Sequence, residues 1–315
     1  MLEFIPCFIY NIIKFDIMRQ RGNSEMKKVI LYNPIAGNGG GEAAARRLEA
    51  MYIGHELVFT DITSISDYAE LFASLSPEDE VILCGGDGTL NCFINSINDV
   101  EINNNILYYA TGSGNDFLND LGKPQGAEPF RINDYIKNLP YVYVNGMKRR
   151  FINGIGYGID GYCCEVGDKI RNASGKKINY TTIAIKGVLF FFKPRGATVT
   201  IDGIAKHYNR VWLAPTMKGR FYGGGMMVAP DRTRRQEDLS VVVAHGCGRL
   251  RLLTILPSVF SGTHIKYKNN IEIHHAKEIT VEFDNPCSLQ IDGETVLDVK
   301  SYTAKVAARD AAIVK

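Results

Sequence analysis

Short apolar runs in the first half of the chain alternate with segments of helical spacing. The runs at residues 29–32, 81–83 and 105–109 are rich in β-favouring residues, and each leads into a loop that contains glycine. Strands that alternate with helices predict an α/β domain with a mainly parallel, three-layer sheet. The other expected elements are a helix over 42–51, a strand over 55–60, a helix over 65–75 begun by Ser64 or Ser66, and a helix over 89–97.

The pattern changes after Pro140, where short β-rich runs are separated by Gly and Asn. Repeated short strands with turn signals predict an all-β antiparallel sandwich or barrel-like domain. One helical segment, residues 176–192, combines lysines with an apolar face, and it either packs on the sandwich or offers a wall to acyl chains or a membrane. The expected strands are residues 141–144, 150–153, 197–201, 209–214, 240–245, 271–274 and 278–283.

The two halves predict two domains, residues 26–140 and 141–300, and we expect residues 301–315 to return to the first domain. A chain of 315 residues is long enough for two such cores. Residues 1–25 predict an extension with no part in the chemistry, because their apolar run is short and interrupted. A short anchor that touches a membrane is the alternative for this stretch.

Charge and cysteine content narrow the class of protein. A net charge of +2 gives no support for nucleic-acid binding or for strong attraction to an anionic membrane. The seven cysteines form no C-x-x-C pair, and several lie in apolar runs. This pattern predicts reduced, buried thiols in a cytoplasmic protein, without a disulfide framework or a zinc site.

The loop after residues 81–83 reads Gly85-Gly86-Asp87-Gly88 and leads into the helix expected over 89–97. Its glycines allow positive φ and close approach of another atom to the backbone. The N–H groups at a helix start suit an anion, but Asp87 would repel a phosphate unless a divalent cation bridges them. The plain alternative is an ordinary strand-to-helix turn in which Asp87 favours the helix start.

Two more glycine-rich loops follow strands, at residues 33–41 and 111–117. Neither carries the Gly-Lys-Ser/Thr of a Walker A loop, and no dinucleotide fingerprint follows the first strand. Ligands of parallel sheets bind beyond the carboxyl ends of the strands. We therefore expect all three loops to line one edge of the sheet.

These motifs resemble the signatures of the diacylglycerol kinase catalytic domain family. Gly-Gly-Asp-Gly-Thr alone is shared with NAD kinases and phosphofructokinases, whereas the third signature narrows the resemblance to lipid kinases, with Ser113 where Thr is usual. The resemblance continues through the second half and covers about residues 28–299. The segments that carry it are Asn33-Pro34 with Gly37, residues 85–91, 112–117, 153–160, 221–226, 229–230 and 289–294.

The resemblance implies an α/β domain like that of phosphofructokinases and NAD kinases, followed by a β sandwich. It implies Mg²⁺ at Asp87, Asp116 and Glu294. It makes Glu294 the first choice of base, with Asp292 or Asp87 as alternates. The residues implied to contact ATP are Asn33, Pro34, Ile35, Ala36, Gly37, Thr60, Gly85, Gly86, Asp87, Gly88, Thr89, Leu90, Asn91, Ser113, Gly114 and Asn115.

The implied activity is an ATP- and Mg²⁺-dependent lipid kinase that converts diacylglycerol to phosphatidic acid at a membrane surface. A sphingoid base, phosphatidylglycerol or a prenol are alternative acceptors, and a non-catalytic nucleotide- or lipid-binding regulator is the third alternative. The expected location is cytoplasmic and peripheral to the membrane, with a homodimer compatible with the sequence and no nucleic-acid partner.

Two basic stretches and one departure from the family complete the expectations. Residues 148–150 and 232–235 are expected to be solvated turns, although the second could meet an anionic headgroup. Gln236-Glu237 stands where the family usually has Asp-Gly, near a structural magnesium of some bacterial members.

Overall fold

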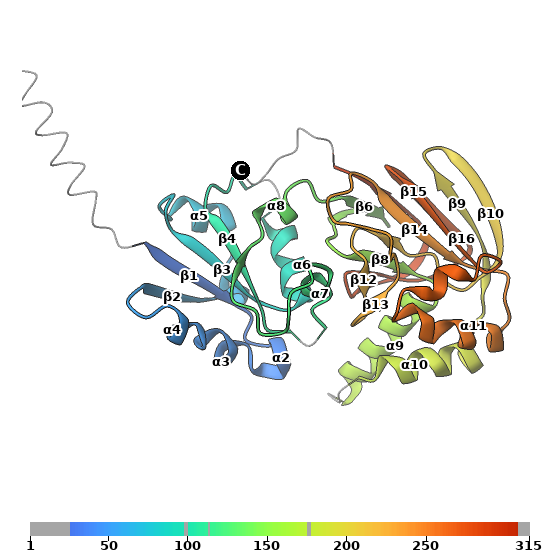
Figure 1. The fold of residues 1–315 in the computed structure, drawn as a ribbon, viewed down its shortest axis with the longest axis horizontal. Helices are drawn as coiled ribbons and strands as arrows, with labels where there is room; N and C mark the ends of the chain where they lie inside the picture. The colour runs from blue at the N-terminus through green and yellow to red at the C-terminus, as the bar shows by residue number, and fades with distance from the viewer. Residues whose placement is uncertain (1–25, 98–99, 113, 175–177, 308–315) are drawn as a thin grey trace, which may run out of the picture.

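A computed structural model describes residues 26–97, 100–112, 114–174 and 178–307. An α/β part from the first half of the chain lies beside a β-rich part from the second half (Figure 1). The expectations for residues 1–25 and for Ser113 lie outside the described residues, as do those for 175–177 and 308–315.

The first part is built on a five-stranded sheet, in the order β2-β1-β3-β4-β5. The strands β2 (Glu56–Asp61), β1 (Lys27–Tyr32), β3 (Glu80–Gly85) and β4 (Asn105–Ala110) are parallel, and the short β5 (Phe130–Arg131) is antiparallel to β4. The prediction of a mainly parallel sheet is therefore confirmed.

Side chains alternate between two apolar layers on the faces of this sheet. Leu31 and Leu83 belong to one cluster of buried residues, and Ile30 and Ile82 belong to another. Helices cover both faces, as expected for a three-layer domain. They are α2 (Ala36–Gly39), α3 (Gly41–Arg46), α4 (Leu48–Met51), the 3₁₀ turn Ile62–Ser64, α5 (Tyr68–Ala73), α6 (Asp87–Ser96), α7 (Asp116–Asp120) and α8 (Asn133–Ile136).

The start of α5 differs from the prediction. Asp67, rather than Ser64 or Ser66, caps this helix, because its carboxylate accepts the N–H groups of Ala69 and Glu70 at 2.7 and 3.1 Å. The helix is therefore shorter than residues 65–75.

The second part contains a ten-stranded antiparallel sheet, which confirms the all-β sandwich domain. Its main path runs β15-β14-β11-β8-β16-β17-β6-β7, and β9 joins β10 to the first half of β16. The strands are β6 (Tyr141–Val144), β7 (Met147–Arg150), β8 (Gly154–Tyr157), β9 (Arg195–Ile201), β10 (Ile204–Val211), β11 (Thr216–Met217), β14 (Leu239–Ala244), β15 (Ile271–Ala276), β16 (Glu278–Ile291) and β17 (Glu294–Lys305), with a separate hairpin of β12 (Phe221–Tyr222) and β13 (Met226–Met227).

Several strand predictions in this part were wrong. The strand expected over residues 150–153 is absent from the structure: β7 ends at Arg150 and β8 begins at Gly154. The N–H groups of residues 152–154 donate to the Asp292 carboxylate instead of to a neighbouring strand. The strand expected at 209–214 ends at Val211, and the strand expected to end at Phe283 continues to Ile291 with a shift of register between Glu282 and Cys287.

Helices α9, α10 and α11 accompany this sheet, whereas the sequence predicted one helical segment in this part of the chain. The segment expected over 176–192 is α10 (Tyr180–Lys186) followed by a π-helical turn, Gly187–Phe191. Beside it lie α9 (Ile159–Ser174) and α11 (Arg249–Ile255), neither of which was predicted (Figure 1). The 3₁₀ turns Leu256–Val259 and Thr263–Lys266 follow α11.

The last described strand belongs to the second part. In β17, Tyr302 pairs with Val144 and Lys305 with Tyr141 of β6. The expected return of residues 301–315 to the first domain stays a prediction for the residues beyond 307. Within the described chain, none of the helices combines the length and apolar character needed to cross a bilayer.

Candidate active site

Loops that follow β1, β3 and β4 lie at the carboxyl edge of the first sheet. After β1, the Asn33 side-chain oxygen accepts the N–H of Ile35 at 3.1 Å, and the Asn33 carbonyl accepts the N–H of Ala36. Gly41 packs directly on this turn, since a Cβ there would lie 1.8 Å from the Asn33 carbonyl oxygen. The loop is thus held by its own backbone, and Ile35 is left 76% exposed.

The loops after β3 and β4 touch one another through glycine. A Cβ on Gly112 would lie 2.5 Å from the Cα of Gly86, and a Cβ on Gly85 would collide with the Thr89 side chain. None of Gly85, Gly86 and Gly88 has a positive φ, so of the two properties that glycine allows, the positive φ is not used here. Close approach is the reason that glycine is needed at 85, 86 and 112.

Asp87 is the first residue of α6, and its carboxylate caps a different helix. It accepts the N–H groups of Asp116 at 2.6 Å and of Phe117 at 3.1 Å, which begin α7. The Asn153 side chain, from the second part of the protein, donates to the same carboxylate at 3.3 Å. Asp87 therefore joins both glycine loops and both halves of the protein.

Asp116 is held from the second part of the protein. Its two carboxylate oxygens accept the N–H groups of Gly224 at 2.9 Å and Gly225 at 2.7 Å, in the loop between β12 and β13. Both glycines have positive φ, which explains this glycine run. Burial, together with the negative charge of Asp87, raises the pKa of the Asp116 carboxyl to about 6.

This shift predicts a pH-dependent stability in the absence of divalent cations. Between about pH 4 and 6 the folded chain holds a proton on Asp116 that the unfolded chain releases, so stability falls as pH rises through this window. We expect a loss of about 2 kcal/mol by pH 7 relative to pH 4 from this group alone. Urea unfolding of the wild type and of Asp116→Asn, at several pH values in EDTA, isolates the contribution of Asp116 to stability. Equal pH profiles of the two proteins would contradict the raised pKa.

Asp87 and Asp116 are the residues of this junction that could hold a divalent cation. Mg²⁺ commonly takes one or two protein carboxylates and fills its remaining positions with water and phosphate oxygens. A cation would also relieve the repulsion that raises the Asp116 pKa. Among the described residues, no group of three or more His, Cys, Asp or Glu side chains is placed to hold a metal. The structure does not bring Glu294 together with the two aspartates in such a group.

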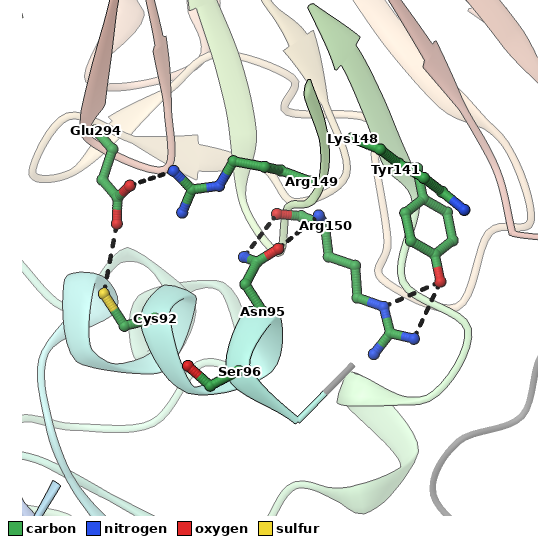
Figure 2. Close-up of a pocket in the computed structure, with 8 residues that line it drawn as sticks. All are labelled: Cys92, Asn95, Ser96, Tyr141, Lys148, Arg149, Arg150 and Glu294. Carbon is green, nitrogen blue, oxygen red and sulfur yellow. Dashed lines mark hydrogen bonds and ion pairs between the residues drawn. The ribbon is translucent and has the colours of Figure 1, made fainter. Parts of the chain in front are cut away.

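Glu294 instead faces the middle of α6. One of its oxygens pairs with Arg149 of β7, and the other accepts the Cys92 thiol at 3.4 Å (Figure 2). The side chain stays 37% exposed. Arg149 also donates to the Asn91 side-chain oxygen at 3.0 Å, so Glu294 is held in place through α6.

Asp292 is buried and fully used by hydrogen bonds. It accepts the N–H groups of Ile152, Asn153 and Gly154 at 2.7 to 2.9 Å, and the Asn91 side-chain amide at 2.8 Å. This arrangement clamps α6 to the second part of the protein and leaves neither oxygen free. The geometry favours a positioning role for Asp292 over the alternate role as base.

Removal of this clamp predicts a large loss of stability. Asp292→Ala leaves four donors without their acceptor, and we expect the free energy of unfolding to fall by about 4 kcal/mol. Asp292→Asn keeps one acceptor oxygen and should lose about half as much. Urea unfolding measures both, with Asp298→Asn on the exposed part of β17 as a control expected to change stability little. A change of less than 1 kcal/mol for the Ala variant would contradict the clamp.

The other expected nucleotide residues fall into two groups. Leu90 is fully buried in the core and Asn91 is bonded to Asp292 and Arg149, so neither side chain is exposed at the sheet edge. Asn115 has a φ of 42° and donates to the Gly112 carbonyl at 2.6 Å. Its buried side-chain oxygen has no hydrogen-bond partner in the described part of the chain, which fits an acceptor for a ligand. Thr60 lies in β2 next to Leu31 of β1.

Arginines that the sequence predicted as solvated are buried at the contact between the two halves. Arg234 pairs with Asp120 of α7 and donates to the Ile152 carbonyl at 2.6 Å. Arg220 donates to the same aspartate at 2.7 Å. Arg150 is 4% exposed, and Arg149 binds Glu294. The prediction of solvation was wrong for Arg150, Arg232 and Arg234, whereas Lys148 and Arg235 are exposed and a turn does lie at residues 234–235. The partner of Arg234 lies far away in sequence, so no local pattern shows its pairing.

The stretch at Gln236 is occupied by cationic side chains. The Lys218 ammonium donates to the Gln236 carbonyl at 2.7 Å, and the buried Arg232 pairs with Asp238 at 3.2 Å. Burial lowers the pKa of Lys218 to about 8, aided by Arg232 and Arg234. These groups do not fit a structural magnesium here, because a cation would meet an ammonium group at the same carbonyl.

Comparison with known proteins agrees with this arrangement. The Diacylglycerol kinase catalytic domain family model matches residues 27–138, and the model of the YegS C-terminal NAD kinase beta sandwich-like domain matches residues 153–309. The fold and these matches define a two-domain protein of the lipid kinase type. The chain belongs to the diacylglycerol kinase catalytic domain family.

Individual relatives span most of the chain. The Diacylglycerol kinase of Mycobacterium tuberculosis (strain ATCC 25618 / H37Rv) is 24% identical over 267 residues, which cover 81% of this chain and 85% of the relative. The Diacylglycerol kinase of Bacillus subtilis (strain 168) is 24% identical over 278 residues, covering 84% and 88%. A crystal structure of a diacylglycerol kinase from Bacillus anthracis str. Sterne has a similar fold, with a TM-score of 0.57, 19% identity, and coverage of 90% of this chain and 94% of that one.

Proposed function

We propose that the chain transfers the terminal phosphoryl group of ATP to a lipid hydroxyl in a Mg²⁺-dependent reaction, with diacylglycerol as acceptor and phosphatidic acid as product. One observation carries the proposal. Asp87 and Asp116 lie together where the glycine loops of the sheet edge meet a loop of the second part of the protein. Phosphoryl transfer depends mainly on positioning and on neutralising phosphate charge, which such a junction can provide.

Backbone groups of the loops and the side-chain oxygen of Asn115 would bind the nucleotide. The loops after β1, β3 and β4 offer close backbone approach, and Asn115 offers a buried acceptor that lacks a partner. Asp87 and Asp116 would hold Mg²⁺, which, when bound, offsets the charge of the phosphates. Asp87 is well fixed for this task, because backbone N–H groups of α7 set the orientation of its carboxylate.

Glu294 would orient the acceptor hydroxyl and take its proton. Its carboxylate is partly exposed, lies on the second part of the protein, and faces α6, the helix that begins with Asp87. Because the transition state of phosphoryl transfer is loose, the proton can leave late and a weak base suffices. Asp292, two residues before Glu294, anchors this part of the chain to α6 and to Ile152.

A lipid panel tests the proposal. The chain is incubated with labelled ATP, Mg²⁺ and mixed micelles of diacylglycerol, a sphingoid base, phosphatidylglycerol or a prenol, and the labelled product is identified. Labelled phosphatidic acid supports diacylglycerol as acceptor, and another labelled lipid corrects the acceptor but keeps the reaction class. Label in free phosphate alone would show ATP hydrolysis and contradict lipid kinase activity, and the absence of any label transfer would favour the non-catalytic regulator.

We also propose that the lipid is met at a membrane surface, on the face formed by the π-helical turn and α11. Phe190, Phe191 and Leu250 are 68%, 65% and 75% exposed. Arg249 of α11 donates to the carbonyl of Val188 in the turn and to that of Phe192 directly after it, so the turn and α11 lie side by side. Exposed Lys186 and Lys193 flank it, as suits an anionic bilayer.

Loss of this face predicts weaker membrane binding. Phe190→Ser with Phe191→Ser removes two exposed rings, and we expect partition onto phosphatidylglycerol-containing vesicles to fall at least about tenfold. Vesicle sedimentation measures it. Leu297→Ser, which removes an apolar side chain 57% exposed on β17, is the matched control and should bind as wild type. Equal binding by all three proteins would exclude this face.

A further inference from the structure

A cavity of about 400 Å³ lies between α6 and the strands β6 and β7, with Glu294 of β17 at one end. Figure 2 shows Arg149 extending toward Glu294 and Arg150 extending toward Tyr141, on opposite sides of Asn95. The cavity is thus adjacent to the proposed base but extends along β7 beyond it.

The lining of this cavity is strongly cationic. Lys148, Arg149 and Arg150 follow one another in β7 and all contribute to it, whereas Glu294 is the single carboxylate among the lining residues. Arg149 pairs with that carboxylate. No Asp or Glu of the described residues lies within ion-pair distance of Lys148 or Arg150. In the part of the chain that the structure describes, these two lining cations therefore have no carboxylate partner, and Lys148 is exposed to solvent.

Arg150 is the more significant of the two because it is buried. It is 4% exposed, and its Nε and Nη2 donate to the Tyr141 hydroxyl at 3.1 and 3.0 Å. Asn95 fixes its backbone through both the N–H and the carbonyl group, at 2.8 and 3.1 Å. Within the described residues, the Arg150 guanidinium therefore has the neutral Tyr141 phenol and no carboxylate as its acceptor. A buried cation in this situation is costly, and an anion in the cavity would reduce that cost.

Lys148 lies on the same tyrosine. Its ammonium group is 4.2 Å from the centre of the Tyr141 ring, and the Arg150 guanidinium is 5.4 Å from it. Both cations thus contact the Tyr141 ring. Arginine and lysine together are the usual partners of phosphate oxygens in proteins.

We propose that this cavity is a binding site for a phosphate group, built on Lys148 and Arg150 and coupled to Glu294 through Arg149. The phosphate belongs either to a phospholipid headgroup or to a small soluble phosphate. A volume of about 400 Å³ accommodates the group with a glycerol-sized substituent.

The coupling follows from the position of Arg149. Its guanidinium donates to Glu294 and to the Asn91 side chain, and it lines the same cavity. A bound phosphate competes for this guanidinium and so weakens the Arg149–Glu294 pair. By linkage, removal of the Glu294 charge must strengthen phosphate binding. The regulatory meaning, release of Glu294 for its proton-accepting role, rests on the proposed function, but the binding does not.

Equilibrium binding to the full chain without ATP or acceptor lipid tests the site. One arm titrates inorganic phosphate and glycerol 3-phosphate by calorimetry, and a second measures sedimentation with phosphatidylglycerol vesicles. In at least one arm we expect Lys148→Ala to weaken binding about fivefold or more and Glu294→Gln to tighten it about threefold. Lys300→Ala, which removes an exposed lysine on β17, should bind as wild type. Arg150→Lys is a second variant, which keeps the positive charge but loses the forked guanidinium group. It should weaken binding less than the double variant that also carries Lys148→Ala.

The two arms separate the sources of the phosphate. An effect of Lys148→Ala in the soluble arm identifies a small phosphate, and an effect confined to vesicles identifies a lipid headgroup. Phosphate held by the glycine loops would not respond to Lys148, so binding unchanged by Lys148→Ala in both arms overturns the site. Lys148-dependent binding that Glu294→Gln fails to tighten overturns the coupling. Because no turnover is measured, a chain that binds phosphate here yet transfers no phosphoryl group would contradict only the proposed function.

Discussion

Asp87→Asn is expected to lower phosphoryl transfer from ATP by about three orders of magnitude, because a carboxylate proposed to hold Mg²⁺ beside the phosphates is lost. The amide keeps the size of the side chain. In the wild type, one carboxylate oxygen accepts the N–H of Asp116 and the other accepts the N–H of Phe117. The amide replaces one of these two acceptors with a donor. We therefore expect a loss of about 1 to 3 kcal/mol in stability as well. Transfer from labelled ATP at saturating lipid and urea unfolding measure the two effects.

Asp67→Asn is the matched control for this variant. Asp67 also accepts two backbone N–H groups at the start of a helix, but it is exposed and both groups belong to the helix it precedes, α5. Because Asn caps a helix about as well as Asp, the Asp67→Asn protein should keep both its stability and its activity. If Asp87→Asn retains more than a tenth of the wild-type rate while folded, the carboxylate has no part in binding the metal or the phosphates.

Glu294→Gln is expected to lower the rate of lipid phosphorylation by about 10² to 10⁴-fold, the range typical of a general base. ATP binding should remain nearly unchanged, because Glu294 lies away from Asp87 and Asp116 and on the other part of the protein. Initial rates with the acceptor identified in the lipid panel, and calorimetric titration with a non-hydrolysable ATP analogue, measure the two properties.

The matched control here is Glu282→Gln. Glu282 is an exposed glutamate of the same sheet that pairs with Lys300 at 3.1 Å, and its substitution should leave the rate unchanged. A normal rate in Glu294→Gln would remove this residue from the proposed role. The role of base would then be open to Asp87, since Asp292 has no free oxygen.

The sequence predicted the first part of the fold well, because its information there is local. Apolar runs at 29–32, 81–83 and 105–109 lie in β1, β3 and β4, and each strand is buried on both faces. The glycine loops that follow them meet at one edge, since parallel strands share the direction of their ends.

Prediction was weaker where a contact between distant residues decides the structure. β16 continues past Asp284-Asn285-Pro286, residues that end a strand when read locally, because β17 pairs with it on both sides of the irregular segment. Arg234 is buried only because Asp120, more than a hundred residues earlier, provides its counter-charge. The same is true of Arg149 and Glu294, whose pairing depends on how β7 and β17 pack against α6. Such pairs leave no mark in local spacing.

The seating of Asp116 on Gly224 and Gly225 has a consequence for how such proteins can be recombined. The half that carries the acidic pair does not by itself provide the two amides that hold one of its members. A chimera that joins this α/β half to the β sandwich of a relative would need glycines in that sandwich at the positions equivalent to Gly224 and Gly225. Without it, the carboxylate would turn to solvent, so the two halves should be inherited as a matched set.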